Sequence, residues 1–314
     1  MVAPAVTGKL IGDPLAAARP SNLWRDTLAN VVRQRSAVVG LVILSILVLV
    51  AVFAPFIATH DPNQGLLGVE EGVQKRAGPC IHLLGCAADK PQHLFGTDGN
   101  FRDVFSRVVF GTRVSLTIGL AAITFAIIVG TLIGSIAGYV GGWADNILMR
   151  LMDVILAFPS LLLAIAIVTA LGAGLEKALI AIGVVSVPIY ARIVRSSVIS
   201  AKENDYVTAS RALGESARGI LFRRILPNSL TPLVVQGTLG IGAAVLEIAA
   251  LTFVGVTGSL DVPEWGSMIG LERSQLFNAP HIILAPGLAI TLTVLGFNLL
   301  GDGLRDALDP RLNR

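Results

Sequence analysis

Six long apolar runs alternate with polar segments along this chain of 314 residues. A helix needs roughly twenty predominantly apolar residues to cross the hydrocarbon core of a bilayer. By that measure, the runs predict transmembrane helices over residues 37–57, 114–140, 147–170, 178–193, 230–254 and 281–300. The pattern therefore predicts an all-α, polytopic membrane protein with six transmembrane helices.

The polar segments give the predicted organisation of the chain. Apolar residues at helical spacing in residues 101–113, with arginines on another face, predict an interfacial helix that leads into the second span. Residues 24–34 fit either a short interfacial helix or part of a disordered leader. We expect, in order, a cytoplasmic leader (1–36), a first transmembrane helix (37–59), an extracytoplasmic loop with its interfacial helix (60–113), a five-helix core (114–300) and a cytoplasmic tail (301–314).

Five residues inside the apolar runs bear on packing and function. Gly130 and Gly134 form a small-xxx-small pair, which lets two helices approach closely. Pro159 and Pro188 predict kinks, whose freed backbone groups must be satisfied by neighbouring helices. Glu247 is the ionisable residue deepest in a run, and such residues usually face a bundle interior or a water-filled cavity. Glu247 fits equally a translocation-path residue and a structural glutamate.

A polar, basic island at residues 206–228 separates the fourth and fifth runs. Its first half predicts a helix over residues 206–213, with an apolar face at Ala209, Ala212 and Leu213. By its spacing alone, the island fits either a surface presented to a partner outside the bilayer or an ordinary amphipathic linker.

The second half of the island predicts a second helix over residues 216–225, with three arginines on its polar side. Gly214 lies where a helix commonly ends in a left-handed residue. Pro227 is expected to stop the second helix, because the residue before a proline is pushed toward extended geometry. The island is therefore expected to be a helix, a glycine turn and a helix.

Composition and charge exclude several classes of protein. The chain is 54% hydrophobic and 14% charged, whereas soluble domains carry roughly 25% charged residues. The net charge of +3 is too small to indicate a nucleic-acid partner. Lys and Arg are twice as frequent on the side of the leader, the island and the tail, which predicts cytoplasmic termini and a cytoplasmic loop at 196–228. Asp153, three residues after Arg150, predicts a surface ion pair.

No enzyme motif is found in the sequence. A phosphate-binding loop needs Gly-x-x-x-x-Gly-Lys-Ser/Thr, and the only Gly-Lys pair, Gly8-Lys9, is followed by leucine. The zinc-protease and nucleophile-elbow patterns are also absent. We therefore expect no catalytic residue and no cofactor in this chain, and any ATP would be hydrolysed by another subunit.

The island resembles the cytoplasmic "EAA" loop of ABC-importer permeases. That pattern is Glu-Ala-Ala, three residues, Gly, nine residues and Ile-x-Leu-Pro, and it docks in a groove of the ATP-hydrolysing subunit. Gly214 and Leu226-Pro227 match it, whereas Thr208 replaces the acid and Arg224 replaces the isoleucine. The resemblance implies an ATPase-coupling site made of Tyr206, Thr208, Ala209, Ser210, Arg211, Gly214, Leu226 and Pro227.

From about residue 24 onward, the chain resembles the C-type permease subunit of dipeptide, oligopeptide and nickel ABC importers, with dipeptide permeases closest. Residues 137–142, 157–162 and 297–310 fit the patterns of that family. Phe101 replaces one glycine of its outer-loop pattern Gly-Thr-Asp-x-x-Gly-Arg-Asp-Val-x-Ser-Arg. The other positions are matched at Gly96, Thr97, Asp98, Arg102, Asp103, Val104, Ser106 and Arg107.

This resemblance implies a type I ABC-importer permease fold in a bacterial inner membrane. It also implies a second homologous permease, two subunits that bind ATP and Mg, and an extracytoplasmic binding protein that delivers the solute. The solute would be a di- or oligopeptide, with nickel or another small solute as the alternative. A secondary transporter or channel is a second reading, although the sequence shows no internal repeat of the kind common in those folds. A membrane enzyme is a third.

The outer loops hold three further candidates. Trp265 fits an interfacial anchor, although the family's loop at this place meets the binding protein. Cys80 and Cys86 have no counterpart in the family pattern, and oxidation is permitted outside the cell, which favours a local disulfide. His82 and His93 lie nearby and leave metal binding as an alternative, with two free thiols as a third. Because the spacing matches no standard zinc pattern, we expect no metal.

Overall fold

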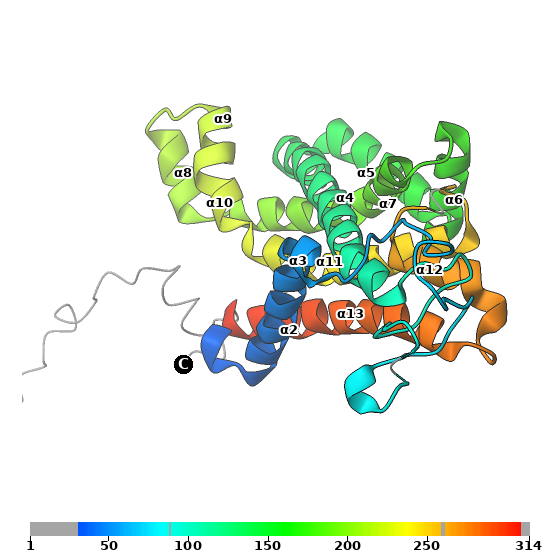
Figure 1. The fold of residues 1–314 in the computed structure, drawn as a ribbon. Helices are drawn as coiled ribbons and strands as arrows, with labels where there is room; N and C mark the ends of the chain where they lie inside the picture. Colours follow the sequence, from blue (N-terminus) through cyan, green and yellow to red (C-terminus); the bar gives the residue numbers. More distant parts are fainter. Residues whose placement is uncertain (1–30, 88, 259–260, 309–314) are drawn as a thin grey trace, which may run out of the picture.

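The computed structural model describes residues 31–87, 89–258 and 261–308, and the regular elements within these ranges are all helices. The leader up to residue 30 and the last six residues of the tail, with the expectations for them, lie outside this part of the chain. The principal helices are α2 (Arg35–Val52), α3 (Ala54–Ile57), α4 (Val104–Val140), α5 (Gly142–Leu156), α6 (Ser160–Leu171), α7 (Leu175–Ala201), α11 (Thr231–Val254), α12 (Trp265–Glu272) and α13 (Pro280–Leu308) (Figure 1).

Five of these helices (α2, α4, α7, α11 and α13) are long and apolar enough to cross a membrane. The pair α5 and α6 passes the same test together but bends by 93° at its break, and it adds a sixth span if it is counted as one. The prediction of an all-α, polytopic membrane protein is therefore confirmed. Residues 301–308, expected in the tail, are the last turns of α13.

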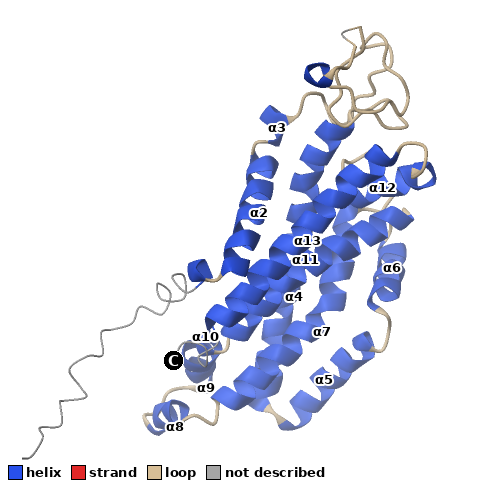
Figure 2. Ribbon diagram, turned by 90° about the horizontal axis from the view of Figure 1, so that it is seen from below, coloured by secondary structure: helices blue, strands red, loops and turns tan. Residues whose placement is uncertain are grey.

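The long helices lie side by side, and the two ends of the bundle carry different structures (Figure 2). One end holds residues 58–103 and α12, which together we call the cap. The polar island projects from the opposite end. Within the bundle, α4 packs chiefly against α7, α11 contacts both α4 and α13, and α2 covers α13. The whole length of the bundle thus separates the island from the cap.

The interfacial helix predicted over residues 101–113 is not an element of its own. Residues 104–113 are the first turns of α4, which is a single helix of 37 residues. One of the arginines that suggested a polar surface face, Arg107, is buried between the first turns of α4 and the cap. Its Nη1 donates to the Pro62 carbonyl at 2.7 Å, and its Nε lies 3.8 Å from Asp98 Oδ2. The charge of Arg107 is therefore compensated inside the protein and not on an exposed face.

Glycines allow the close contact between α4 and α7, as Gly130 and Gly134 predicted. A Cβ atom at Gly130 would lie 2.7 Å from the Cβ of Tyr190, and one at Gly134 would overlap the Ala191 carbonyl. Gly138, one turn further along, faces the backbone of Arg195 in the same way. Only a hydrogen fits at these positions, so the helix that carries the island is held tightly against α4.

The prolines affect the helices to different degrees. At Pro159, where a kink was expected, the backbone is extended and α5 and α6 separate completely. Pro188 lies inside α7, which continues through it. Near the end of the first span, α2 ends at Val52, and Pro55 lies in the first turn of the short helix α3.

Two ion pairs join α5 to α7. Arg195 donates from Nε and Nη2 to the two carboxylate oxygens of Asp145, the Nη2 contact being 2.6 Å. Arg192 Nη2 donates to Asp153 Oδ1, also at 2.6 Å. The predicted pair between Asp153 and Arg150 is therefore wrong, because an arginine from the neighbouring helix reaches the carboxylate instead. The helix α5, which precedes the 93° break, is thus tied to α7.

Candidate functional site

The polar island consists of two helical arms joined at a glycine. The first arm is α8 (Asp205–Ala212), and the second is a continuous helical run of α9 (Ala217–Gly219), the π-helical turn η2 (Ile220–Ile225) and α10 (Leu226–Asn228). Gly214 has a φ of +78°, so the left-handed turn predicted from the sequence is present. The structure thus has the expected helix, glycine turn and helix.

Pro227 does not stop the second arm, and that prediction is wrong. The helical run passes through Pro227 and ends at Asn228. In a regular α-helix, the proline ring collides with the carbonyl four residues earlier and removes one hydrogen bond. Here the wider π-helical turn η2 comes directly before it, and such turns occur as local insertions in α-helices. The wider turn gives the ring room without ending the helix.

The arms pack on each other through a small apolar contact. Val207 of α8 is fully buried, and it belongs to the same hydrophobic core as Ile220 and Ile225 of the second arm. An ion pair of 3.1 Å between the Glu215 carboxylate and Arg224 Nε ties the turn to the second arm. This core is continuous with that of α4 and α7, so the island is an extension of the bundle.

The predicted apolar face of α8 points away from this contact. Ala209, Ala212 and Leu213 are exposed, and Leu213 has 88% of its surface accessible. The buried face is instead that of Val207 and Ser210. Of the predicted coupling residues, only Ser210 is buried and Leu226 is half-buried. The exposed ones are Tyr206, Thr208, Ala209, Arg211, Gly214 and Pro227.

Glu247 lies on α11, opposite the break between α5 and α6. The hydroxyl of Ser160, the first residue of α6, donates to Glu247 Oε1 at 3.3 Å. The carboxyl group is half-buried. Glu247 is seven residues from the cap-side end of α11, or about 10 Å along the helix axis. The structure therefore brings a carboxyl group and an interrupted helix together.

The predicted extracytoplasmic residues form a buried network in the cap. Asp98 accepts from Nε and the backbone N–H of Arg102, at 2.8 and 2.9 Å. The Thr97 hydroxyl donates to a backbone carbonyl at 2.7 Å, and Gly96 has a φ of +76°. Asp103 caps α4 by accepting from Ser106 N–H at 2.7 Å. These residues shape the loop and are too buried to meet a solute directly.

Phe101 and Trp265 both depart from what their residue types suggest. Phe101, which replaces a glycine of the family pattern, has a φ of +59°, a conformation in which glycine is favoured. Trp265 is completely buried, so its assignment as an interfacial anchor is wrong. Its Nε1 donates to the Val108 carbonyl at 3.1 Å, and its ring occupies the space that the missing side chain of Gly111 leaves.

Two buried carboxylates of the cap were missed. Glu264 caps α12 by accepting from Ser267 N–H at 2.8 Å, and burial raises the pKa of its carboxyl group. Glu272 accepts from Arg76 Nε at 2.8 Å and from Gly99 N–H at 2.7 Å, and it thereby joins α12 to the loop. An acid directly before a short apolar helix could have indicated the first; the sequence holds no sign of the second.

Cys80 and Cys86 are joined in a disulfide. His82 begins a short 3-10 turn between them, and its Nε2 lies 2.8 Å from the carbonyl oxygen of Lys90. The backbone of His93 pairs with that of Cys80, but its imidazole contacts Asp103. The two histidines that suggested a metal site near the cysteines therefore do not meet.

Comparison with known proteins gives two family matches and many relatives. Residues 130–314 match the family described as the binding-protein-dependent transport system inner membrane component. Residues 22–75 match the N-terminal TM domain of oligopeptide transport permease C. The chain is 46% identical to the dipeptide transport system permease protein DppC of Alkalihalophilus pseudofirmus, over 92% of this chain and 90% of that one. It is 40% identical to DppC of Haemophilus influenzae, over 90% and 92% of the two chains, and 39% identical to the glutathione transport system permease protein GsiD of Pectobacterium atrosepticum, over 92% and 91%.

Proposed function

This chain belongs to the family of binding-protein-dependent transport system inner membrane components, and we propose that it is the permease through which an ATP-driven importer moves small peptides. The observation that carries the proposal is the island: a glycine-linked pair of helices that projects from one end of the bundle with an exposed, partly apolar tip. A permease that hydrolyses no ATP itself needs such a surface to receive force from another subunit.

We propose that the island docks on one of two ATP-binding subunits, which would hold ATP and Mg. Tyr206 and Leu213 would enter its groove with the exposed Ala209 beside them, since exposed apolar patches on a monomer often mark a contact with a partner. The tight contact between α4 and α7 would carry a displacement of the island into the bundle. A second, homologous permease and an extracytoplasmic binding protein would complete the importer.

The same proposal orients the chain in the inner membrane. With the island and both termini in the cytoplasm, the cap faces outward. Two observations support this orientation: the excess of Lys and Arg on the side of the island, and the disulfide in the cap, since disulfides persist in oxidising compartments.

For the translocation path, we propose the region of Glu247 and the break between α5 and α6. Interrupted helices commonly form solute sites in transporters, because free backbone groups are tolerated where they line a cavity. A carboxylate at this place would attract the ammonium group of a peptide. The names of the dipeptide and glutathione relatives support a peptide as the solute.

Uptake in a strain that lacks this chain tests the proposal. We expect uptake of a labelled dipeptide to be lost, to be restored by the wild-type chain, and to be competed by unlabelled dipeptides more strongly than by nickel. Glu247→Gln should lower dipeptide uptake while leaving the amount of membrane protein unchanged. Uptake that persists after ATP depletion but collapses with the proton gradient would instead indicate a secondary transporter.

A further inference from the structure

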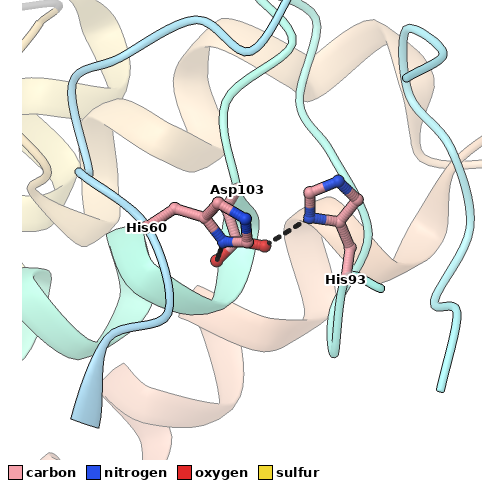
Figure 3. Close-up of side chains that lie close together, drawn as sticks. All are labelled: His60, His93 and Asp103. Atoms are coloured by element: carbon pink, nitrogen blue, oxygen red, sulfur yellow. Dashed lines mark hydrogen bonds and ion pairs between the residues drawn. The ribbon is translucent and has the colours of Figure 1, made fainter. Parts of the chain in front are cut away.

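Two histidines and two carboxylates meet in the cap, between the end of the first span and the start of α4. His60 follows α3, Glu70 and His93 lie in the loop, and Asp103 is the N-cap residue of α4. One nitrogen of each imidazole and one oxygen of Asp103 all lie within 4.8 Å of one another. Figure 3 shows both rings next to the Asp103 carboxylate.

Asp103 determines which nitrogen of His93 carries the proton. Its Oδ1 lies 3.0 Å from His93 Nδ1, and its Oδ2 accepts from Ser106 N–H at 2.7 Å and from the Thr59 hydroxyl at 3.3 Å. An ionised carboxylate can only accept hydrogen bonds. The proton of a neutral His93 is therefore on Nδ1, and its Nε2 presents a lone pair.

That lone pair has no hydrogen-bond partner among the residues that the structure describes. His93 is 2% exposed, and its Nε2 is buried. Glu70 Oε2 lies 3.5 Å from this nitrogen; it is likewise buried and accepts no hydrogen bond from the described part of the chain. His60 Nε2 lies 3.7 Å from the same oxygen. Acceptor atoms that face one another inside a protein are unfavourable unless a proton or a metal ion lies between them.

We propose that His93 Nε2, His60 Nε2 and the Glu70 carboxylate bind a divalent transition-metal ion, with Zn²⁺ as the best fit to these ligands. Zinc takes imidazole nitrogen and carboxylate oxygen at about 2.0–2.2 Å, usually in a tetrahedron. Ligand atoms at the corners of such a tetrahedron lie about 3.3–3.6 Å apart, close to the two separations that involve Glu70. The centroids of the two imidazole rings lie 5.1 Å apart, so movements of these side chains would bring the three atoms to one ion.

Asp103 is the positioning residue of this site. A metal-bound histidine almost always donates its other N–H to a carboxylate or a carbonyl, which fixes the ring and makes the ligating nitrogen more basic. The hydrogen bond from His93 to Asp103 has this form. Because Asp103 also caps α4, the ion would tie the end of the first span and the loop to the first turn of α4.

The cysteine disulfide lies beside the same structure, since the Cys80 N–H donates to the His93 carbonyl at 2.8 Å. The loop would thus be closed twice, once by the disulfide and once by the ion. The ion would have a structural role in the cap and no part in moving the solute.

Metal content of the whole importer, purified with an affinity tag that contains no histidine, tests the site. After dialysis against dilute zinc and removal of the excess, elemental analysis should find one zinc ion per chain in the wild type. His93→Gln and Glu70→Gln should lose it, and His82→Gln, which changes an exposed histidine of the same loop, should keep it. Asp103→Asn keeps a good helix cap but should weaken zinc binding by about 10–100-fold.

A second measurement distinguishes loss of the metal site from loss of the fold. Cobalt(II) in place of zinc should give the visible absorption of a tetrahedral site in the wild type, and Glu70→Gln should abolish it while circular dichroism stays unchanged. If the wild type binds no more zinc than His93→Gln does, a proton bridges His93 and Glu70 and the proposal is wrong. It is equally wrong if His82→Gln loses the ion.

Discussion

Replacing Gly214 with valine tests whether the island transmits force. A Cβ atom at Gly214 would meet no atom within 4 Å, so space does not forbid a side chain there. The obstacle is the backbone, because a φ of +78° is strongly disfavoured for a β-branched residue. The substitution therefore changes the conformation of the turn and leaves the packing of the bundle intact.

The cost of keeping a left-handed valine is about 1–2 kcal/mol. The small contact between Val207 and the second arm is the main apolar contact that resists a change of angle between the arms. We expect the turn to relax toward negative φ and to move α8, with Leu213 at its tip. The exposed surface of the island would then no longer fit its partner.

The assay compares Gly214→Val with Gly214→Asn, since asparagine tolerates the left-handed region and adds a side chain of similar size. Both variants should reach the membrane at the wild-type level. Gly214→Val should lose most of the ATPase stimulation by the loaded binding protein and should co-purify poorly with the ATP-binding subunits, whereas Gly214→Asn should keep both. Normal uptake and co-purification with Gly214→Val would refute the reasoning and leave the island as a linker.

Three further predictions concern the cap and the topology. Phe101→Gly should be more stable than Phe101→Ala by about 1 kcal/mol in chemical unfolding, because both lose the ring and only glycine relieves the positive φ; equal stability would contradict this. Burial raises the pKa of Glu264, so its contribution to stability is present at low pH and lost as the pH rises through the folded-state pKa. Glu264→Gln should therefore have a higher melting temperature than the wild type at pH 8. This difference in melting temperature should shrink as the pH is lowered toward the usual glutamate pKa of about 4.3, and a constant difference would argue against this cause. Phe277→Cys, at a side chain 94% exposed, should be labelled from outside intact cells, and Leu213→Cys only after permeabilisation; the opposite pattern would invert the topology.

Most of the fold could be predicted from the pattern of apolar residues and from the spacing of the glycines. The six runs correspond to five long helices and the bent pair. The spacing of Gly130 and Gly134 is enough to predict a close contact between helices, and the structure identifies the partner as α7. The island was predictable because its signals are local: a helical period, a glycine at the turn and a polar flank. The end of the second arm was wrong, since a π-helical turn before Pro227 leaves no trace in residue spacing. The buried face of α8 was also not the predicted apolar one.

The cap could not be predicted in the same way, because its contacts join residues far apart in the sequence. Arg107 suggests a surface helix by its spacing, and only its partners in the loop explain why it is buried. Trp265 is buried only because Gly111, more than a hundred residues away, leaves room for its ring. His60 and His93 gave no metal pattern, since a site built from distant loop residues has no fixed spacing.

The length of α4 has a mechanical consequence. At 1.5 Å per residue, its 37 residues extend about 55 Å, well beyond a hydrocarbon core of about 30 Å. One end of this rod carries the Asp103 cap and the other is locked to α7 at Gly138. A tilt of about 5° around its centre would move each end by about 2 Å, in opposite directions. A rigid helix that tilts in this way transmits motion without a series of rearranged side chains. A small displacement of its end near the island produces an equal displacement of its end in contact with the cap.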